Sequence, residues 1–250
     1  MTAVLDIAGV EVRVVRKDVR NLHLSVLPPD GIVRITAPPW MDVEAIRLFC
    51  IDKLGWIRRQ QRKMREQPRE TPHDYVDRES HYLWGDRYLL QVVESDAAPH
   101  VDRRHRKLVL HIRKNTDTRQ RDAIFQAWYR QQLRQALPAL LGHWVLLVGK
   151  EPTRVHVQRM KTKWGSCNPS LGSIRLNSEL AKKPREYLEY VLLHELMHLV
   201  EPSHGARFVA GLDRLMPQWR DRREALNRLP IARTGSGSKV SPRFHAVSAI

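Results

Sequence analysis

The stretch VLLHELMHLVEPSHGARF, residues 191–208, constrains the fold of this chain more than any other part of the sequence. It places His194 and His198 four residues apart in an apolar run with helical periodicity, so both imidazoles project from one face of a helix, one turn apart. Pro202 cannot extend that helix and disfavours helical angles at the residue before it, so the chain must turn there. His204 follows six residues after His198, which lets the returning chain bring a third imidazole to the same place.

This pattern, HExxH followed by a third histidine, predicts a metal site. Histidines at i and i+4 of a helix can hold one ion, and three protein nitrogens leave a fourth tetrahedral position to water, which is typical of a catalytic zinc site. Glu195 points to another side of the ion, from which it can take a proton from zinc-bound water without being a ligand. We therefore expect His194, His198 and His204 to bind zinc and Glu195 to act as the general base.

Other roles for residues in this region remain open from the sequence alone. The histidines could be core or capping residues, although three of them beside a glutamate make that interpretation the weaker one. Glu201 and Cys167 are alternative ligands. The position of Glu201 at the turn favours a supporting role, and an isolated thiol is more often a small buried apolar group.

The chain carries a large positive charge, with 43 Lys and Arg against 27 Asp and Glu and a formal net charge of +16. Such an excess attracts polyanions, so nucleic acid or a phosphorylated ligand is a possible partner. Two basic clusters stand out, at residues 58–65 and 103–107. A solvated surface with no functional partner explains them equally well.

The sequence contains neither a run of 18 apolar residues nor a basic N-terminus followed by an apolar block, so we expect no membrane span and no secretory signal. Its two cysteines, Cys50 and Cys167, are far apart and form no disulfide framework. This usage is typical of a reducing compartment, and we expect a cytoplasmic protein.

The first 115 residues have the period-two alternation of β-strands together with one helix. Alternating apolar residues predict strands near residues 10–14, 22–26, 33–35 and 108–112, a turn at residues 28–31, and a hairpin over 82–93 about Gly85-Asp86. Asp42 is a candidate N-cap for a helix that continues to Met64. We expect an antiparallel, β-rich N-terminal domain over residues 1–115.

The remainder of the chain has a different pattern. Helical periodicity over residues 118–148 predicts one or two helices with a break or kink at Pro138. A short strand at 155–158 and a helix beginning near Pro184 follow. Residues 229–250 are rich in Gly and Ser and have no period, so we expect a flexible tail. The fold class is therefore α+β, with a second domain over residues 116–228.

Residues 159–219 closely resemble the YgjP-like metallopeptidase family of zinc-dependent hydrolases. The resemblance rests on a WGSC segment, a G-x-I-x-LN strand and HELxHLxxxxH in that order, and the β-rich part before them is similar with looser motifs. It implies a zincin-like metallohydrolase core in which His194, His198 and His204 bind zinc and Glu195 is the general base. The family commonly has Asn before its third histidine, where this chain has Ser203.

The resemblance also suggests how a substrate binds. In zincin-like folds a strand beside the active-site helix can bind an extended peptide at the sheet edge, and GSIRLN, residues 172–177, is the candidate strand. Trp164 either forms a wall of the cleft or packs beneath the site, and in the second case Cys167 packs there too. Met216 either forms an apolar floor below the metal ligands or belongs to the core. Candidate donors to a tetrahedral intermediate are Arg175, Asn177 and Tyr187.

Three functions remain from different classes. The leading one is a zinc metallopeptidase acting on peptides or on proteins bound to nucleic acid, as similar SprT-like proteases are thought to do. The alternative is a zinc-dependent nucleotide phosphohydrolase of the nucleoside triphosphate pyrophosphatase type, because the same activated water could attack phosphorus. The third is a binding module with a structural metal, although Glu195 argues against it.

Overall fold

The computed structural model describes residues 2–27, 31–66, 72–160 and 163–229. Most of the expected turn at 28–31 and nearly all of the expected tail at 229–250 lie outside these residues. The described residues of Met1–Arg69 form one compact unit and those of Glu70–Ala232 form another. The sequence placed a domain boundary at residue 115 instead, but the strands before that residue share a hydrophobic core with the helices after it.

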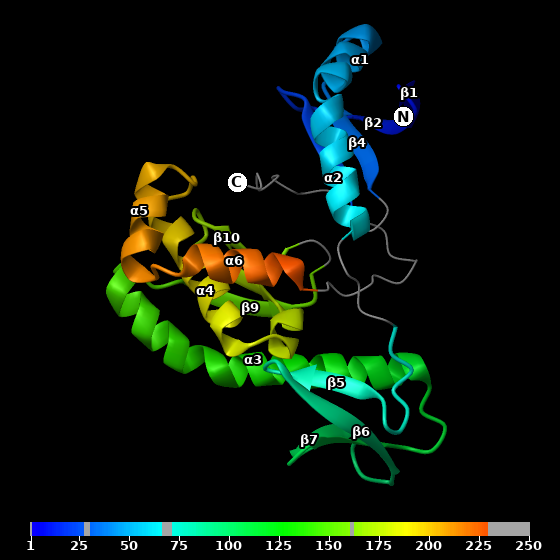
Figure 1. Ribbon diagram of the computed structural model, residues 1–250, viewed down its shortest axis with the longest axis vertical. Coiled ribbons are helices and arrows are strands. Elements are labelled where there is room, and N and C mark those ends of the chain that lie inside the picture. Colours follow the sequence, from blue (N-terminus) through cyan, green and yellow to red (C-terminus); the bar gives the residue numbers. More distant parts are fainter. Residues whose placement is uncertain (1, 28–30, 67–71, 161–162, 230–250) are drawn as a thin grey trace. The chain divides into compact units, whose positions relative to one another are not determined.

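The first unit contains a mixed four-stranded sheet and two helices (Figure 1). The elements are β1 (Thr2–Ile7), β2 (Val10–Arg16), β3 (His23–Leu27), β4 (Ile32–Ala37), α1 (Val43–Asp52) and α2 (Leu54–Glu66). The strand order is β1-β2-β4-β3, with β2 and β4 parallel. The expectation of a purely antiparallel sheet is therefore wrong. Two hairpins lie side by side with the second strand of each at the centre, and they meet so that these two strands run in the same direction.

The single helix expected from Asp42 to Met64 is two helices. Asp42 does begin it, since its carboxylate accepts a hydrogen bond from the Val43 N–H at 2.7 Å. Lys53 then leaves helical geometry, with ψ near 3°, and its N–H donates to the Phe49 carbonyl at 3.2 Å. A break of one residue does not disturb the apolar spacing enough to be visible in the sequence.

The second unit contains two sheets and the remaining helices (Figure 1). The first sheet consists of β5 (Ser80–Leu83), β6 (Asp86–Glu94), β7 (His100–Arg104) and β8 (Lys107–Ile112), and the second of β9 (Arg154–Gln158), β10 (Gly165–Asn168) and β11 (Ser173–Asn177). The helices are α3 (Thr118–Val148), the 3-10 turn η1 (Ser178–Lys182), α4 (Arg185–Val200), α5 (Ala206–Leu215) and α6 (Trp219–Arg228). The strand orders are β5-β6-β8-β7 and β10-β11-β9.

Each of these sheets is also mixed, because β6 pairs with β8 and β9 with β11 in parallel. The predicted hairpin is confirmed, but its turn is Trp84-Gly85, with Leu83 opposite Asp86. Both turn residues have positive φ, 53° and 89°, as a type I′ turn requires. A Cβ on Gly85 would lie 2.9 Å from Pro184 Cγ, so this glycine also lets the hairpin approach the start of α4.

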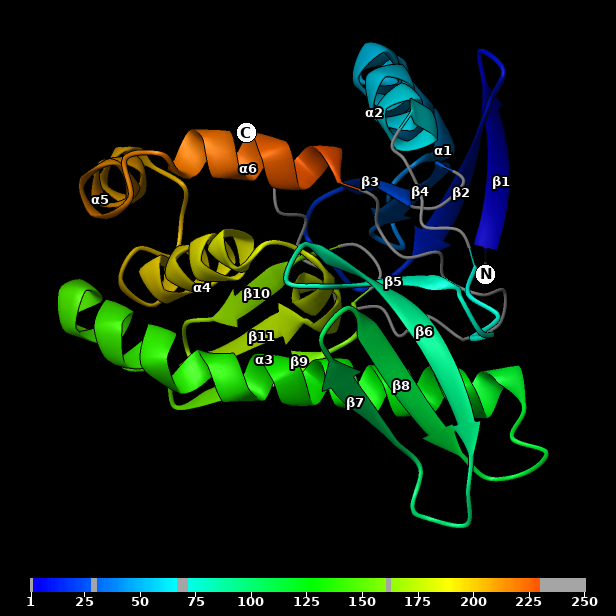
Figure 2. The ribbon, with the colours of Figure 1, turned by 60° about the horizontal axis from the view of Figure 1, so that its bottom comes forward.

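The helix α3 is continuous over 31 residues and contains Pro138 without a break. It packs against β7, β9 and α4, and Figure 2 shows it running along both sheets of the second unit. Buried residues on both sides of the proline, Leu133, Leu137 and Trp144, hold the helix to the core, which outweighs the lost hydrogen bond. No helix in the described part of the chain has both the length and the apolar character needed to cross a membrane.

Candidate metal centre

The central helix of the second unit, α4, carries the first two histidines and the glutamate. It begins after Pro184 and ends at Val200, as the sequence predicts. Ten of its 16 residues are buried, so it is covered on nearly all sides, which is typical of a helix at the centre of a core. The Glu201 N–H closes the last turn on the Met197 carbonyl at 2.8 Å, and Pro202 follows.

The structure brings the three predicted histidines together. His204 lies just before α5, and one ring nitrogen from each of His194, His198 and His204 lies within 4.8 Å of the others. The Nε2 atoms of His194 and His204 are 3.1 Å apart. For Zn–N bonds of about 2.0–2.1 Å, two ligands of a tetrahedral ion lie about 3.3–3.4 Å apart. His194 and His204 are therefore spaced as two ligands of one zinc-sized ion, and His198 lies close enough to be the third.

The charge state of these histidines also suits a metal. Burial, followed by the positive charges of His198 and His204, lowers the pKa of His194 to about 3. Burial and the neighbouring His204 lower the pKa of His198, and burial with the nearby Arg223 lowers that of His204. All three imidazoles are therefore neutral at pH 7, which is the form that binds metal.

Neighbouring groups orient the rings. The Nδ1 of His198 lies 3.3 Å from the Glu201 carbonyl, so Nδ1 carries the proton and Nε2 keeps its lone pair. Glu201 thus supports the site through its backbone, while its carboxylate lies 3.9 Å from the Arg207 guanidinium. The centroid of the Phe208 ring, on α5, lies 4.6 to 5.0 Å from the ring centroids of all three imidazoles, and the ring stacks on His198.

Glu195 is buried beside this cluster, with 6% of its surface exposed. Burial raises its pKa to about 8, against the opposing effect of the positive charge of Lys163. Strand β10 comes close to it at Gly165, where an added Cβ would lie 2.6 Å from Oε1 of Glu195 and 2.8 Å from Cγ1 of Val191. The glycine of the WGSC segment therefore makes room for the glutamate side chain.

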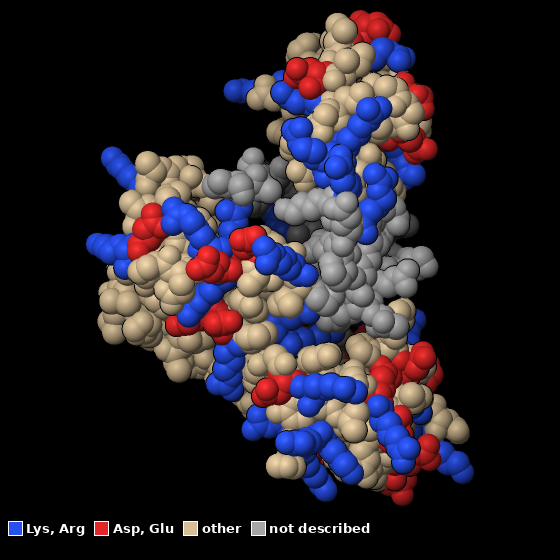
Figure 3. Space-filling model, viewed as in Figure 1, with Lys and Arg blue, Asp and Glu red and all other residues tan. Residues whose placement is uncertain are grey.

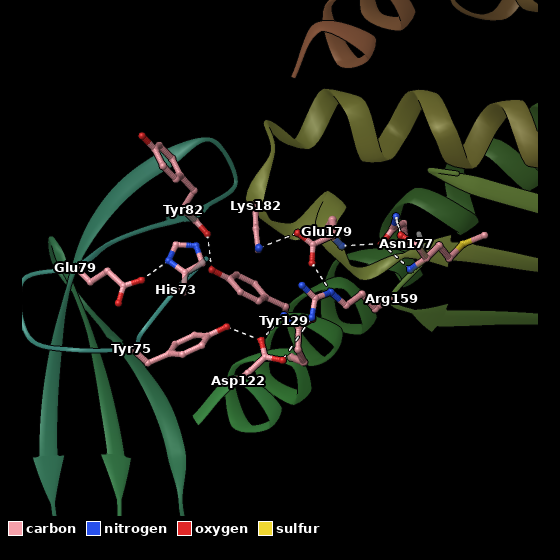
Figure 4. Close-up of polar contacts among 12 residues, drawn as sticks. His73, Tyr75, Glu79, Tyr82, Asp122, Tyr129, Arg159, Asn177, Glu179 and Lys182 are labelled. Carbon is pink, nitrogen blue, oxygen red and sulfur yellow. Dashed lines mark hydrogen bonds and ion pairs between the residues drawn. The ribbon is translucent and has the colours of Figure 1, made fainter. Parts of the chain in front are cut away.

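Asn177 holds the segment that leads into β10. Its side chain donates to the carbonyls of Met160 and Lys163 at 2.9 and 2.8 Å and accepts from the Met160 N–H at 3.1 Å. The amide oxygen also accepts from the N–H of Glu179. Figure 4 shows this amide at one end of a polar chain in which Arg159 joins Glu179 to Asp122. Asn177, 1% exposed, therefore supports the structure of the site.

Two other candidates, Arg175 and Tyr187, differ in how far the structure buries them. Arg175 is exposed on β11 between two buried residues, so it points to the opposite face from the core. The expectation that residues 172–177 form the peptide-binding edge is wrong, because β11 is the middle strand of its sheet, and β10 and β9 are the two edge strands. Tyr187 is half-buried on α4.

The remaining candidates are packing residues. Trp164 and Cys167 are half-buried against the main core and Met216 is fully buried. Burial, with the nearby Glu195, raises the pKa of the Cys167 thiol to about 12, so it is neutral and is a poor ligand in this state.

The sequence did not reveal the roles of Phe208 and Gly165. Phe208 is four residues after His204 on the next helix, and that spacing was the available signal. Gly165 carries no such signal, because its contact with Glu195 joins a strand to a helix 30 residues later.

Comparisons with known proteins give a family. A model of the family described as YgjP-like, metallopeptidase domain, matches residues 20–229. No curated protein matches the chain. Among solved structures, the metallopeptidase zymogen of Pyrococcus abyssi abylysin is 20% identical over 37% of this chain and 97% of its own, with a TM-score of 0.34. The metallopeptidase zymogen of Methanocaldococcus jannaschii jannalysin is 21% identical over 35% of this chain and 84% of its own, with a TM-score of 0.32.

TM-scores this low do not establish a shared fold, so the assignment stands on the family match alone. That match covers most of the chain, including residues 20–69 of the first compact unit and nearly all of the second. The chain belongs to the YgjP-like metallopeptidase domain family.

Proposed function

We propose that this protein is a zinc-dependent peptidase in which His194, His198 and His204 hold the ion and Glu195 is the general base. The observation that carries the proposal is the convergence of three neutral imidazoles within 4.8 Å, on and beside a helix that also buries a carboxylate. When bound, zinc supplies Lewis acidity that polarises a carbonyl and makes water acidic near neutral pH.

The protein's own groups supply the remaining steps. The Glu195 carboxylate receives the proton of the attacking water and passes it to the amine that leaves. Its raised pKa, about 8 without a metal, lies close to the range in which a group can both accept and return a proton. Phe208 and the core around α4 cover part of the ligand cluster and bury His198, which strengthens electrostatic interactions there.

We place an extended peptide substrate along β10. This strand is at the edge of its sheet, so its outer backbone groups can pair with another strand. The contact between Gly165 and Glu195 means that a peptide on this edge would run beside the general base. The peptide bond nearest Gly165 would then be the one cleaved.

We also propose a polyanion as an additional partner, in line with the net charge of the sequence. The helix α2 exposes Arg58, Arg59, Arg62 and Arg65, and Figure 3 shows Lys and Arg side chains along its visible face. Both cysteines are unpaired, in keeping with the proposed cytoplasmic location.

The test begins with metal content, measured on the untagged wild type, His204→Ala and Glu195→Gln. We expect His204→Ala to lose about one zinc per chain and Glu195→Gln to keep it. The same proteins are then assayed with peptide libraries and with nucleoside triphosphates. If wild type cleaves peptides and both variants lose this activity, the result supports the proposal. Nucleotide hydrolysis without peptide cleavage would show the phosphohydrolase instead, and equal metal in wild type and His204→Ala would refute the ligand set.

A further inference from the structure

The outer face of the sheet β5–β8 brings together two histidines and an aspartate. His100 and Asp102 are two residues apart on β7, with buried Val101 between them, so both side chains point away from the core. His111 lies on β8 directly opposite His100. Side chains at i and i+2 of one strand and at the facing position of its neighbour are close enough to share a ligand.

The ligand atoms lie at distances suited to one metal ion. The Oδ2 of Asp102 is 3.5 Å from the Nε2 of His100 and 3.4 Å from the Nε2 of His111. These distances are longer than a good hydrogen bond, but they match the separation of about 3.3–3.4 Å between ligands of a tetrahedral zinc ion. One nitrogen from each histidine and one carboxylate oxygen therefore surround a common point.

The two ring nitrogens are available as ligands. The Nδ1 of His100 lies 2.8 Å from the Ala98 carbonyl, so Nδ1 carries the proton and Nε2 keeps its lone pair. The Nε2 of His111 is buried, and within the described part of the chain it has no hydrogen-bond partner. A buried ring nitrogen without a partner is unfavourable, and a metal ion would satisfy it.

Two features must change when the ion binds. The rings of His100 and His111 are stacked at 4.3 Å with planes 6° apart, so the His100 ring, nearly half exposed, must tilt to direct its lone pair at a shared ion. The Arg104 guanidinium lies 3.8 Å from Asp102 and must move away. Its side chain is 67% exposed, so its attraction to the carboxylate is weak and its movement is unhindered.

We propose that His100, Asp102 and His111 form a second metal site, which takes a zinc-type divalent ion through two imidazoles and one carboxylate. Two nitrogens and one oxygen are ligands that zinc accepts, with water as the fourth. Strand β7 is at the edge of its sheet, and the ion fastens it to β8. The site involves none of the residues of the candidate metal centre, so it does not depend on the proposed function.

The test is metal binding by the full-length, untagged chain, with zinc and cobalt chloride as probes. Metal-free protein is titrated against a chromophoric chelator, and the number of ions is checked by elemental analysis. Asp102→Asn and His111→Ala should each bind one ion fewer than wild type. His156→Ala, which removes an exposed histidine of β9, is the matched control and should bind as wild type does.

Variants of the other histidine clusters separate the possibilities. His204→Ala should lose a different ion, so that combining it with His111→Ala removes two. His73→Ala tests a third cluster, in which His73 is hydrogen-bonded to Glu79 near His81, and it should have no effect. Wild-type binding by both Asp102→Asn and His111→Ala would overturn the proposal, as would loss of the second ion in His73→Ala. If His111→Ala does not fold, Asp102→Asn and His100→Ala, at more exposed positions, decide the outcome.

Discussion

Replacing Gly165 by alanine tests the link between β10 and the general base most directly. The new methyl group would lie 2.6 Å from Oε1 and 2.8 Å from Cγ of Glu195, and 2.8 Å from Cγ1 of Val191. Ordinary contacts begin near 3.4 Å, so these neighbours must move. Overpacking of this kind lowers the free energy of unfolding by about 1–3 kcal/mol. Alanine also lowers the conformational entropy of the unfolded chain, which stabilises the fold by about 0.4–1 kcal/mol.

The expected net loss of stability is about 0–2.6 kcal/mol, which corresponds to a melting temperature lower by up to roughly 10 °C. Displacement of the Glu195 carboxylate by about 1 Å should also lower peptidase kcat/KM about 100-fold. Zinc content should stay at the wild-type level, because the histidine ligands are not touched. Thermal unfolding of the metal-free protein, elemental analysis and a peptide-cleavage assay measure the three effects.

Two further variants make the reasoning refutable. Gly142→Ala is the matched control, because nothing lies within 4 Å of its Cβ position inside α3, and it should stabilise by about 0.5–1 kcal/mol. In a Glu195→Ala background, most of the cost of Gly165→Ala should disappear, because two of its three close contacts are gone. An equal cost in both backgrounds would show that the crowding does not involve Glu195.

Three other perturbations have defined outcomes. Asn177→Ala should cost at least about 1–3 kcal/mol in urea unfolding, because it leaves buried backbone groups without partners, whereas Asn168→Ala, which removes one exposed hydrogen bond, should cost under about 0.5 kcal/mol. The folded pKa of His194, lowered mainly by burial to about 3 from 6.5, means that below pH 6.5 the unfolded chain binds a proton that the folded chain does not. The raised pKa of Glu195 acts in the opposite direction over this range, so the effect of His194 is measured as a difference between two proteins. Between pH 6.5 and 5, metal-free wild type should lose about 2 kcal/mol of stability relative to His194→Ala, and the same pH dependence in both proteins would contradict this. Asp117→Ala, which removes the capping box of α3, should cost about 0.5–2 kcal/mol, and an unchanged urea midpoint would count against that cap.

Local signals were sufficient for much of the fold. The N-cap at Asp42, the hairpin near Gly85 and the start of α4 after Pro184 depend on residues close together in the chain, and each lies where the sequence predicted it to within one residue. Strand direction could not be predicted from such local signals. Whether β2 and β4 run parallel depends on how two hairpins meet, which no local pattern records.

The candidate site shows the same division. The sequence alone predicted that His194 and His198 share a face of one helix, because helical spacing fixes it, and Pro202 predicted the turn that brings His204 back. Only the tertiary structure decided that Phe208 packs on the three imidazoles and that Gly165 makes room for Glu195. The first contact depends on how α5 packs against α4, and the second joins residues 30 positions apart. The physical reason is that backbone geometry relates neighbours along the chain, whereas side-chain packing relates residues that meet only when the whole core has formed.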